Sequence, residues 1–148
     1  MTRARVVAGD QDLGNRLLDM LEPHVWDNGL TAEEIREIRR MKARIEAERI
    51  PTNEDPDFHL KLGRGSLSDI EFTAQLLQLQ YGVKATGTLD ALRALSDSDV
   101  LAADDASVLA EAYVFCERVR NRWYLVNSAP GDSLPAQPES LLWLARAL

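Results

Sequence analysis

The sequence predicts an all-α protein, a helical bundle of about five to seven helices. Apolar residues recur every three or four positions along almost the whole chain, which is the spacing of helices that bury one face. No segment shows the alternation of apolar and polar residues that marks a half-buried strand. With 148 residues, of which 45% are hydrophobic, the chain is long enough to form a core, so we expect a single helical domain over residues 1–148.

Two helices are expected before residue 50. Asp10 is placed to cap the first, which ends near Pro23 or Trp26. Thr31 and Glu34 have the spacing of a capping box and open a second, long and highly charged helix. The expected apolar stripes are Leu13, Leu17, Leu18 and Leu21 on the first helix, and Ile35, Ile38, Met41 or Lys42, and Ile45 on the second. The Asn28-Gly29 pair predicts the turn between them.

Four more helices are expected in the rest of the chain. In order, they run from Ser66 or Ser68 to about Tyr81, from Thr88 to about Leu95, from Asp104-Asp105 to a stop at Pro130-Gly131, and from Glu139 to Leu148. The first of these four is so apolar that we expect it at the centre of the bundle. The stripe expected on the long helix is Val108, Leu109, Ala112, Phe115, Cys116, Val119, Trp123 and Val126.

Composition excludes several classes of protein. The net charge of −7 argues against a general nucleic-acid binder, because such proteins present clustered positive charge to phosphates. No apolar run approaches the roughly 18 residues of a membrane span, and the polar, charged N-terminus is not a signal peptide. Cys116 is the only cysteine and cannot form an internal disulfide, so we expect a buried structural thiol in a cytoplasmic protein.

A basic, glycine-rich loop before the apolar helix is the feature best suited to binding. It contains Lys61, Gly63, Arg64, Gly65 and Ser66. Glycines let a backbone turn tightly and approach a partner, and a helix start presents unpaired N–H groups that favour an anion. The spacing fits no Walker loop, and no strand precedes it. Two interpretations therefore stay open: a junction that contacts phosphate, and a well-capped helix start with solvated charges.

Two carboxylates follow this loop. Asp69 and Glu71, just after Gly65-Ser66, superficially resemble the pair with which nucleotidyltransferases hold catalytic magnesium ions. That pair needs a strand, where alternate residues share a face, whereas residues two apart on a helix do not face each other. His24 and His59 are isolated, without a second ligand at zinc spacing. We therefore predict no catalytic residue and no metal site in this chain.

The two carboxylates still need a structural role. In one interpretation, they stabilise the helix start through the helix dipole and caps. In the other, they meet an arginine or the edge of a nucleotide site in an adjacent domain. A buried carboxylate on so apolar a helix needs a partner. Arg118 and Arg122, one turn apart on the long helix, are the candidates for an architectural pairing with Asp69 and Glu71.

Several blocks of the chain occur in a recognisable order. The main block is Lys-Leu-Gly-Arg-Gly-Ser-Leu-Ser-Asp-Ile-Glu-Phe at residues 61–72, followed by Gln75-Leu76-Leu77-Gln78-Leu79. The other blocks are Arg3–Asp10, Glu34–Lys42, Thr88–Leu92 and Asp132–Pro135. Together they resemble the helical domain of bacterial glutamine synthetase adenylyltransferases. One departure is that the family usually has a second glycine where Ser66 stands, which bears on how closely a partner can approach the backbone.

The resemblance implies that the chain is a domain of a longer enzyme of nitrogen regulation, with a nucleotidyltransferase domain upstream. The abrupt start inside a family block, at Met1-Thr2-Arg3, agrees with this expectation. Such an enzyme moves AMP from ATP to a tyrosine of glutamine synthetase and also removes it. It uses magnesium and ATP and is regulated by a PII-type signal protein and glutamine. The resemblance implies no cofactor bound by this chain, which we expect to be inactive alone.

The resemblance also suggests roles for individual segments. Lys61 and Arg64 are its expected contacts to nucleotide phosphate or to the catalytic domain, and Arg3 and Arg5 would lie at the domain junction. The helix over residues 35–49, the run over 48–51 and the Asp132–Pro135 block resemble the C-terminal, adenylylating half as found in actinobacteria.

Two alternatives stay open. One is the helical region of a PII uridylyltransferase, which has a related glycine-rich segment. The other is a stand-alone helical interaction module without enzymatic context. The Glu71-Phe72 continuation and the flanking blocks favour the adenylyltransferase, and the abrupt start argues against the stand-alone module.

Overall fold

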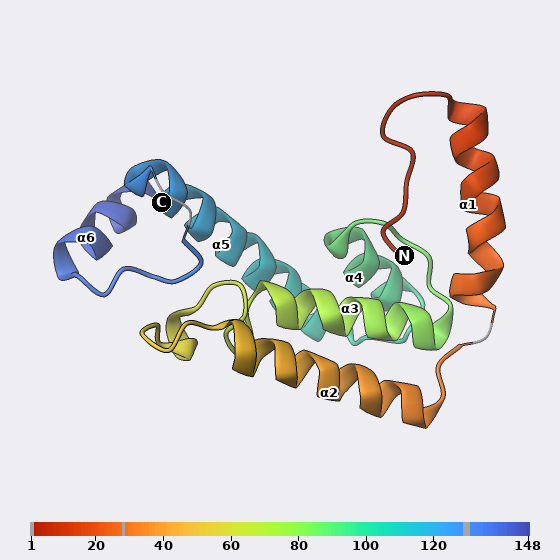
Figure 1. Ribbon diagram of the computed structural model, residues 1–148, viewed down its shortest axis with the longest axis horizontal. Coiled ribbons are helices and arrows are strands. Elements are labelled where there is room, and N and C mark those ends of the chain that lie inside the picture. The colour runs from red at the N-terminus through yellow and green to blue at the C-terminus, as the bar shows by residue number, and fades with distance from the viewer. Residues whose placement is uncertain (1, 28, 129–130) are drawn as a thin grey trace. The chain divides into compact units, whose positions relative to one another are not determined.

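The computed structural model describes residues 2–27, 29–128 and 131–148. In these residues the chain is 67% helical and contains no strand, which confirms the predicted all-α class. The α-helices are α1 (Gln11–Trp26), α2 (Ala32–Arg49), α3 (Leu67–Tyr81), α4 (Thr88–Asp97), α5 (Ala103–Asn127) and α6 (Pro138–Ala147), and a short 3-10 helix, η1 (Pro56–Phe58), precedes α3 (Figure 1). The predicted Asn28-Gly29 turn, the Pro130-Gly131 stop and the start at Met1 lie partly outside the described residues.

The chain forms two compact units, each made from two stretches of sequence. The first unit consists of Met1–Arg39 and Phe72–Ala106, and the second of Arg40–Glu71 and Ser107–Leu148. Helices α2, α3 and α5 therefore contribute residues to both units. The single domain expected over residues 1–148 stays a prediction.

Side-chain caps open the first two helices where the sequence predicted them. An Asp10 carboxylate oxygen accepts the Leu13 N–H at 3.0 Å. At α2, the Glu34 N–H donates to the Thr31 hydroxyl at 3.2 Å, and the Thr31 N–H donates to the Glu34 carboxylate at 2.8 Å. The hydrogen bonds from the Thr31 hydroxyl and N–H hold the pKa of Glu34 below its ordinary value. The capping box is confirmed.

In the first unit, most of the buried residues lie on α4 and α3. Ala91, Leu92 and Leu95 on α4 are at most 1% exposed. Gln78 on α3 is 2% exposed, and its amide donates to the carbonyl oxygens of Val83 at 3.1 Å and Ala85 at 2.8 Å. The buried amide therefore holds the loop that leaves α3, and its two hydrogen bonds offset the cost of removing it from water.

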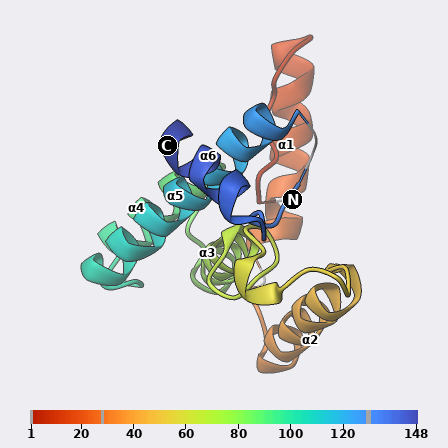
Figure 2. The ribbon, with the colours of Figure 1, turned by 90° about the vertical axis from the view of Figure 1, so that its left-hand side faces the viewer.

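In the second unit, the core joins the loop before α3 to the C-terminal part of the chain. Leu60, Val119 and Leu144 form its centre, and Trp123 and Leu134 pack against them. These residues come from the loop, α5, α6 and the segment between those two helices. Figures 1 and 2 both show α6 beside the C-terminal part of α5.

The stripe predicted on α5 is correct at its centre. Val119 is buried and Trp123 is half-buried. Cys116 is also half-buried, and burial raises the pKa of its thiol. Val108, Phe115 and Val126, however, are 65%, 60% and 44% exposed, so the predicted stripe is wrong at these three positions.

Candidate functional site

A segment from far along the chain holds the entry to the glycine-rich loop. The Leu60 N–H donates to the Asp132 carbonyl oxygen at 2.6 Å, and the Leu134 N–H donates to the Phe58 carbonyl oxygen at 2.9 Å. These bonds form an antiparallel bridge between His59 and Ser133. We call the two paired segments, residues 58–60 and 132–134, the clasp. The clasp therefore joins the Asp132–Pro135 block to the entry of the glycine-rich loop.

Side chains reinforce the clasp. The Ser133 hydroxyl donates to the Glu54 carboxylate, and the Arg120 Nε on α5 donates to the Asp132 carboxylate. The Arg120–Asp132 pair is part-buried, with 39% and 31% of the two side chains exposed. The Arg120–Asp132 pair ties the clasp to α5, and the Ser133–Glu54 bond ties it to the segment before η1, 79 residues away in sequence.

His59, in the middle of the clasp, is 5% exposed. Its Nδ1 accepts the N–H groups of Leu62 at 3.0 Å and Lys61 at 3.3 Å. A ring nitrogen that accepts hydrogen bonds carries no proton, so the ring proton is on Nε2. That atom lies 3.8 Å from the Glu54 carboxylate. This histidine thus orders the loop, a role that its isolation in the sequence did not indicate.

Most backbone N–H groups of the loop are hydrogen-bonded within the chain. Within the loop, the Gly63 N–H donates to the His59 carbonyl at 2.9 Å, and the Ser66 N–H donates to the Gly63 carbonyl at 3.2 Å. The Gly65 N–H donates to the Asp69 carboxylate at 2.6 Å. At the start of α3, the Leu67 N–H donates to the Leu60 carbonyl at 3.2 Å, and the Ser68 N–H donates to the Lys61 carbonyl at 2.9 Å. The first N–H groups of α3 are therefore occupied by the loop itself. This supports the interpretation of a capped helix start.

The serine that replaces the family's second glycine takes part in this internal bonding. Ser66 is 5% exposed, and its hydroxyl donates to the Gly63 carbonyl oxygen at 2.6 Å. Its side chain therefore closes the turn and does not face a partner. The neighbours Lys61, Arg64 and Gly65 are exposed, so the loop presents charged side chains on an ordered backbone.

Asp69 pairs with a lysine of α2. Its Oδ1 accepts from the Lys42 ammonium, and its Oδ2 accepts from the Gly65 N–H. Burial alone would raise the pKa of Asp69, but the Lys42 ammonium and the Gly65 N–H hold it below its ordinary value. Burial likewise opposes the charge on Lys42, yet Asp69 and Glu46 keep the pKa of Lys42 above its ordinary value. The sequence left open whether Met41 or Lys42 lies on the inner stripe of α2. In the structure Lys42 is half-buried and Met41 is exposed, so Lys42 occupies that position.

The pairing of Asp69 and Glu71 with Arg118 and Arg122, which the sequence suggested, stays a prediction. Glu71 accepts a hydrogen bond from the Tyr113 hydroxyl at 3.1 Å. Arg118 donates to the Leu148 carbonyl oxygen, and Arg122 is exposed. Lys42 and Tyr113 were missed as partners because nothing in the local sequence pattern relates them to the acids of α3.

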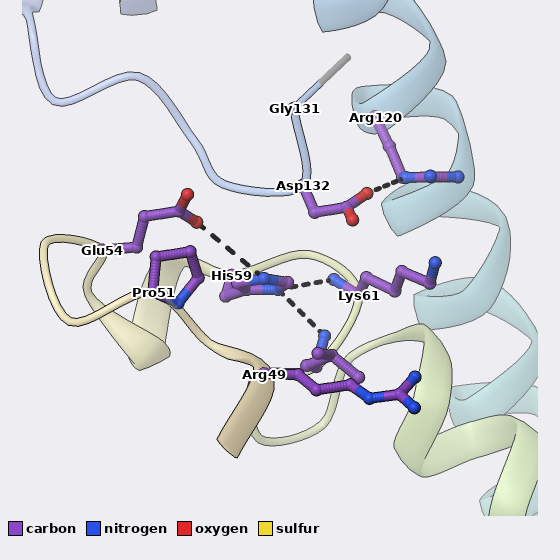
Figure 3. Close-up of a pocket in the computed structure, with 9 residues that line it drawn as sticks. Arg49, Pro51, Glu54, His59, Lys61, Arg120, Gly131 and Asp132 are labelled. Atoms are coloured by element: carbon purple, nitrogen blue, oxygen red, sulfur yellow. Dashed lines mark hydrogen bonds and ion pairs between the residues drawn. The ribbon is translucent and has the colours of Figure 1, made fainter. Parts of the chain in front are cut away.

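Lys61 and Arg64 line different pockets. Lys61 lines a pocket of about 420 Å³ that we call the basic pocket (Figure 3). Its lining residues are Arg49, Pro51, Glu54, His59, Lys61, Leu62, Arg120, Gly131 and Asp132. Arg64 instead lines a pocket of about 510 Å³ with Gly63 and the end of α2. The two cations of the loop therefore have different surroundings.

The basic pocket collects positive charge from three segments of the second unit. Arg49 comes from the last turn of α2, Lys61 from the loop and Arg120 from α5. In the view of Figure 3, the Lys61 side chain lies between those of Arg120 and Arg49. Arg49 and Arg120 were not predicted as site residues, since only the folded chain brings them to the loop.

Within residues 2–27, 29–128 and 131–148, no group of three or more His, Cys, Asp or Glu residues could hold a metal ion. In the same part of the chain, no helix is long and apolar enough to cross a membrane.

Comparisons with known proteins agree on one group of relatives. The family model described as GlnD PII-uridylyltransferase matches residues 29–148. Over the whole chain, the sequence is 45% identical to the bifunctional glutamine synthetase adenylyltransferase/adenylyl-removing enzyme of Streptomyces avermitilis and 42% identical to that of Streptomyces coelicolor. It is 44% identical over 99% of the chain to the enzyme of the same name from Mycolicibacterium smegmatis. The chain spans 15% of the length of each of these relatives.

Proposed function

Because the chain belongs to the family described as GlnD PII-uridylyltransferase, we propose that it is the helical accessory region of an enzyme that adenylylates glutamine synthetase and removes the AMP again. The observation that carries the proposal is the 42–45% identity, over the whole chain, to enzymes named for these two activities. In this proposal the chemistry belongs to a nucleotidyltransferase domain outside the chain. That domain supplies the carboxylates that hold magnesium and ATP, and glutamine synthetase is the protein substrate.

The role proposed for this chain is to support that catalytic domain. The glycine-rich loop suits a rigid contact surface, because its backbone is internally hydrogen-bonded while Lys61 and Arg64 are exposed. An ordered surface loses little conformational entropy when it docks. We further propose the C-terminal, adenylylating half of the enzyme and regulation by a PII-type signal protein, which rest on the family resemblance. A cytoplasmic location is proposed from the single cysteine.

A PII uridylyltransferase is the second candidate, because the matching family model carries that description. The two candidates differ in nucleotide and protein substrate, so one assay separates them. The curated relatives favour adenylylation, since their whole-chain identity covers every block singled out in the sequence.

A chimera tests the proposal. The aligned segment of the Streptomyces avermitilis relative is replaced by this chain, and transfer of labelled AMP from ATP to glutamine synthetase is measured. We expect the chimera to transfer AMP, the same relative with the segment deleted to lose the activity, and this chain alone to transfer none. A folded chimera that cannot modify glutamine synthetase, or one that instead transfers UMP to a PII-type protein, would contradict the proposal.

A further inference from the structure

We propose that the basic pocket is a phosphate site, in which Arg49, Lys61 and Arg120 bind the oxygens of a phosphate group. The inference deepens the proposed function, on which it rests for the link between this site and the phosphate-containing ligands of an adenylylating enzyme. It differs from the expectation drawn from the sequence in one respect. The ligand is held by side chains from three segments and not by the backbone of the glycine-rich loop.

Two of the three cations are available for a ligand. Within the described residues, the structure shows no ion pair or hydrogen bond for the side chains of Arg49 and Lys61. Arg49 stands in the last turn of α2, where a cation is also favoured by the helix dipole. Lys61 is held at its backbone, because its N–H donates to His59 Nδ1 and its carbonyl oxygen accepts from Ser68. The clasp thus fixes where the Lys61 side chain begins.

Arg120 is the third cation and is already positioned. Its Nε donates to Asp132, which orients the guanidinium plane and leaves the terminal nitrogens for a second acceptor. A guanidinium has five N–H donors, so it can bind a carboxylate and a phosphate together. Asp132 therefore has a positioning role and is not simply an opposing charge.

The carboxylates of the pocket are engaged by other groups. Asp132 accepts from Arg120, and Glu54 accepts from the Ser133 hydroxyl and lies beside His59 Nε2. The pocket lining thus has three cations against two carboxylates. Two further pockets of the described residues have a different balance of charge: one has Arg64 with Glu46 and Glu54, and another has Glu54 and Asp55 without a cation. A lining with excess positive charge stands out in a chain whose net charge is −7.

The number and origin of the cations favour phosphate over a carboxylate. One planar guanidinium is enough to bind both oxygens of a carboxylate. A phosphate has at least three oxygens and more negative charge, so it can use cations that come from several directions. The volume of about 420 Å³ is in the range of small-molecule sites and leaves room for a group attached to the phosphate.

Direct binding measurements test the site. Pyrophosphate, inorganic phosphate and ATP are titrated into the chain by calorimetry at low ionic strength. We expect binding by pyrophosphate, and about tenfold weaker binding for each of Arg49→Ala and Lys61→Ala, because each removes a charge-assisted hydrogen bond. Arg64→Ala is the matched control: it removes one positive charge from the same loop but from a different pocket, so the affinity should stay unchanged. The inorganic and nucleotide arms distinguish a site for free phosphate from a site for a nucleotide.

Three results would overturn the phosphate site. These are no binding of any of the three probes at millimolar concentration, equal weakening by Arg64→Ala, and glutamate binding as tightly as pyrophosphate. Lys61→Gln, which removes the charge and shortens the side chain by only one atom, serves if Lys61→Ala lowers the thermal midpoint. If the chimera is active but the chain binds no phosphate, the phosphate site is wrong and the proposed function stands. If the chain binds phosphate but the chimera is inactive toward glutamine synthetase, only the proposed function is wrong.

Discussion

Helix α1 and the glycine-rich loop differ in how far their sequence patterns agree with their burial. α1 has a capping residue at Asp10 and leucines at helical spacing, and it forms where expected. Yet all its residues are described and none is buried, and Leu13, Leu17 and Met20 are 64%, 56% and 71% exposed. A regular apolar pattern thus predicts a helix without ensuring that another segment covers it.

The glycine-rich loop shows the opposite combination. It has no periodicity, but His59, Leu60, Gly63 and Ser66 are buried. These four residues are buried because the clasp, the Lys42–Asp69 pair and the helix start of α3 all bond to the loop. Long-range bonds therefore determine order here, whereas local spacing determines order in α1. Substitutions in the two regions should accordingly have very different effects on stability.

The largest effect is expected at Gly63. A Cβ at this position would lie 2.5 Å from the His59 carbonyl oxygen and closer still to that of Pro56, both of them backbone atoms. The turn must then move, so we expect Gly63→Ala to lower the free energy of unfolding by about 3 kcal/mol. Urea denaturation followed by circular dichroism measures the change.

Gly65→Ala is the matched control for that substitution. Gly65 has a φ of +71°, but a Cβ there would meet nothing within 4 Å. Only backbone strain of about 1 kcal/mol is expected. If the two alanine variants prove equally stable, close packing of the loop backbone is not what orders it.

The second effect is expected at His59. Its Nδ1 accepts the N–H groups of Leu62 and Lys61 in a buried position, and His59→Ala leaves both donors without an acceptor. We expect a loss of about 2 to 3 kcal/mol in the free energy of unfolding. His59→Asn places an amide oxygen near the position of Nδ1, so it should recover part of the loss. Identical midpoints for the alanine and asparagine variants would show that ring packing matters and the two hydrogen bonds do not.

These residues show why sequence analysis predicted the helices better than the candidate site. The capping box at Thr31 and Glu34 and the bounds of α3 depend on residues within a few positions of each other, so they can be read from spacing. The Lys42–Asp69 pair joins residues 27 apart, and the Ser133–Glu54 bond joins residues 79 apart. Such contacts exist only after the chain has folded, and a single sequence contains no periodic signal for them.

The prediction for the loop was partly correct for the same reason. Its glycines indicate a tight turn, and Gly65 indeed has a positive φ. The unpaired N–H groups expected at the start of α3 are instead used by the loop's own carbonyls. Arg49 and Arg120, which complete the basic pocket, come from α2 and α5, and no motif of the loop points to them.

The third effect is the pH dependence of the Lys42–Asp69 pair. Asp69 has a lowered pKa, so its contribution is complete above its ordinary pKa of 3.8 and is lost as the pH falls through the folded-state pKa. Lys42 has a raised pKa, so its contribution is complete below its ordinary pKa of 10.5 and is lost as the pH rises through the folded-state pKa. We expect Asp69→Asn to lower the free energy of unfolding by about 1 to 2 kcal/mol at neutral pH.

Denaturation across the acid range checks this expectation. The difference in free energy of unfolding between Asp69→Asn and the unchanged chain should narrow below about pH 4, as the Asp69 carboxylate of the unchanged chain becomes protonated. Asp90→Asn is the control, because the Asp90–Arg93 pair on α4 is exposed at 68% and 73% of its side chains and contributes less than about 0.5 kcal/mol. A difference for Asp69→Asn that stays constant from neutral to acid pH would rule out its charge as the cause.

The smallest effect is expected on α1. Leu17 is 56% exposed, so Leu17→Ala removes little buried surface and should change the free energy of unfolding by at most about 0.5 kcal/mol. The same substitution at Leu60, which is 7% exposed in the core of the second unit, should cost about 2 to 3 kcal/mol. Both variants lose the same atoms, so the change in side-chain size is equal and the difference between the two effects reports mainly on burial. A large effect at Leu17 in this chain would mean that another segment or molecule covers α1 in solution, and that its leucine stripe is buried as the periodicity predicts.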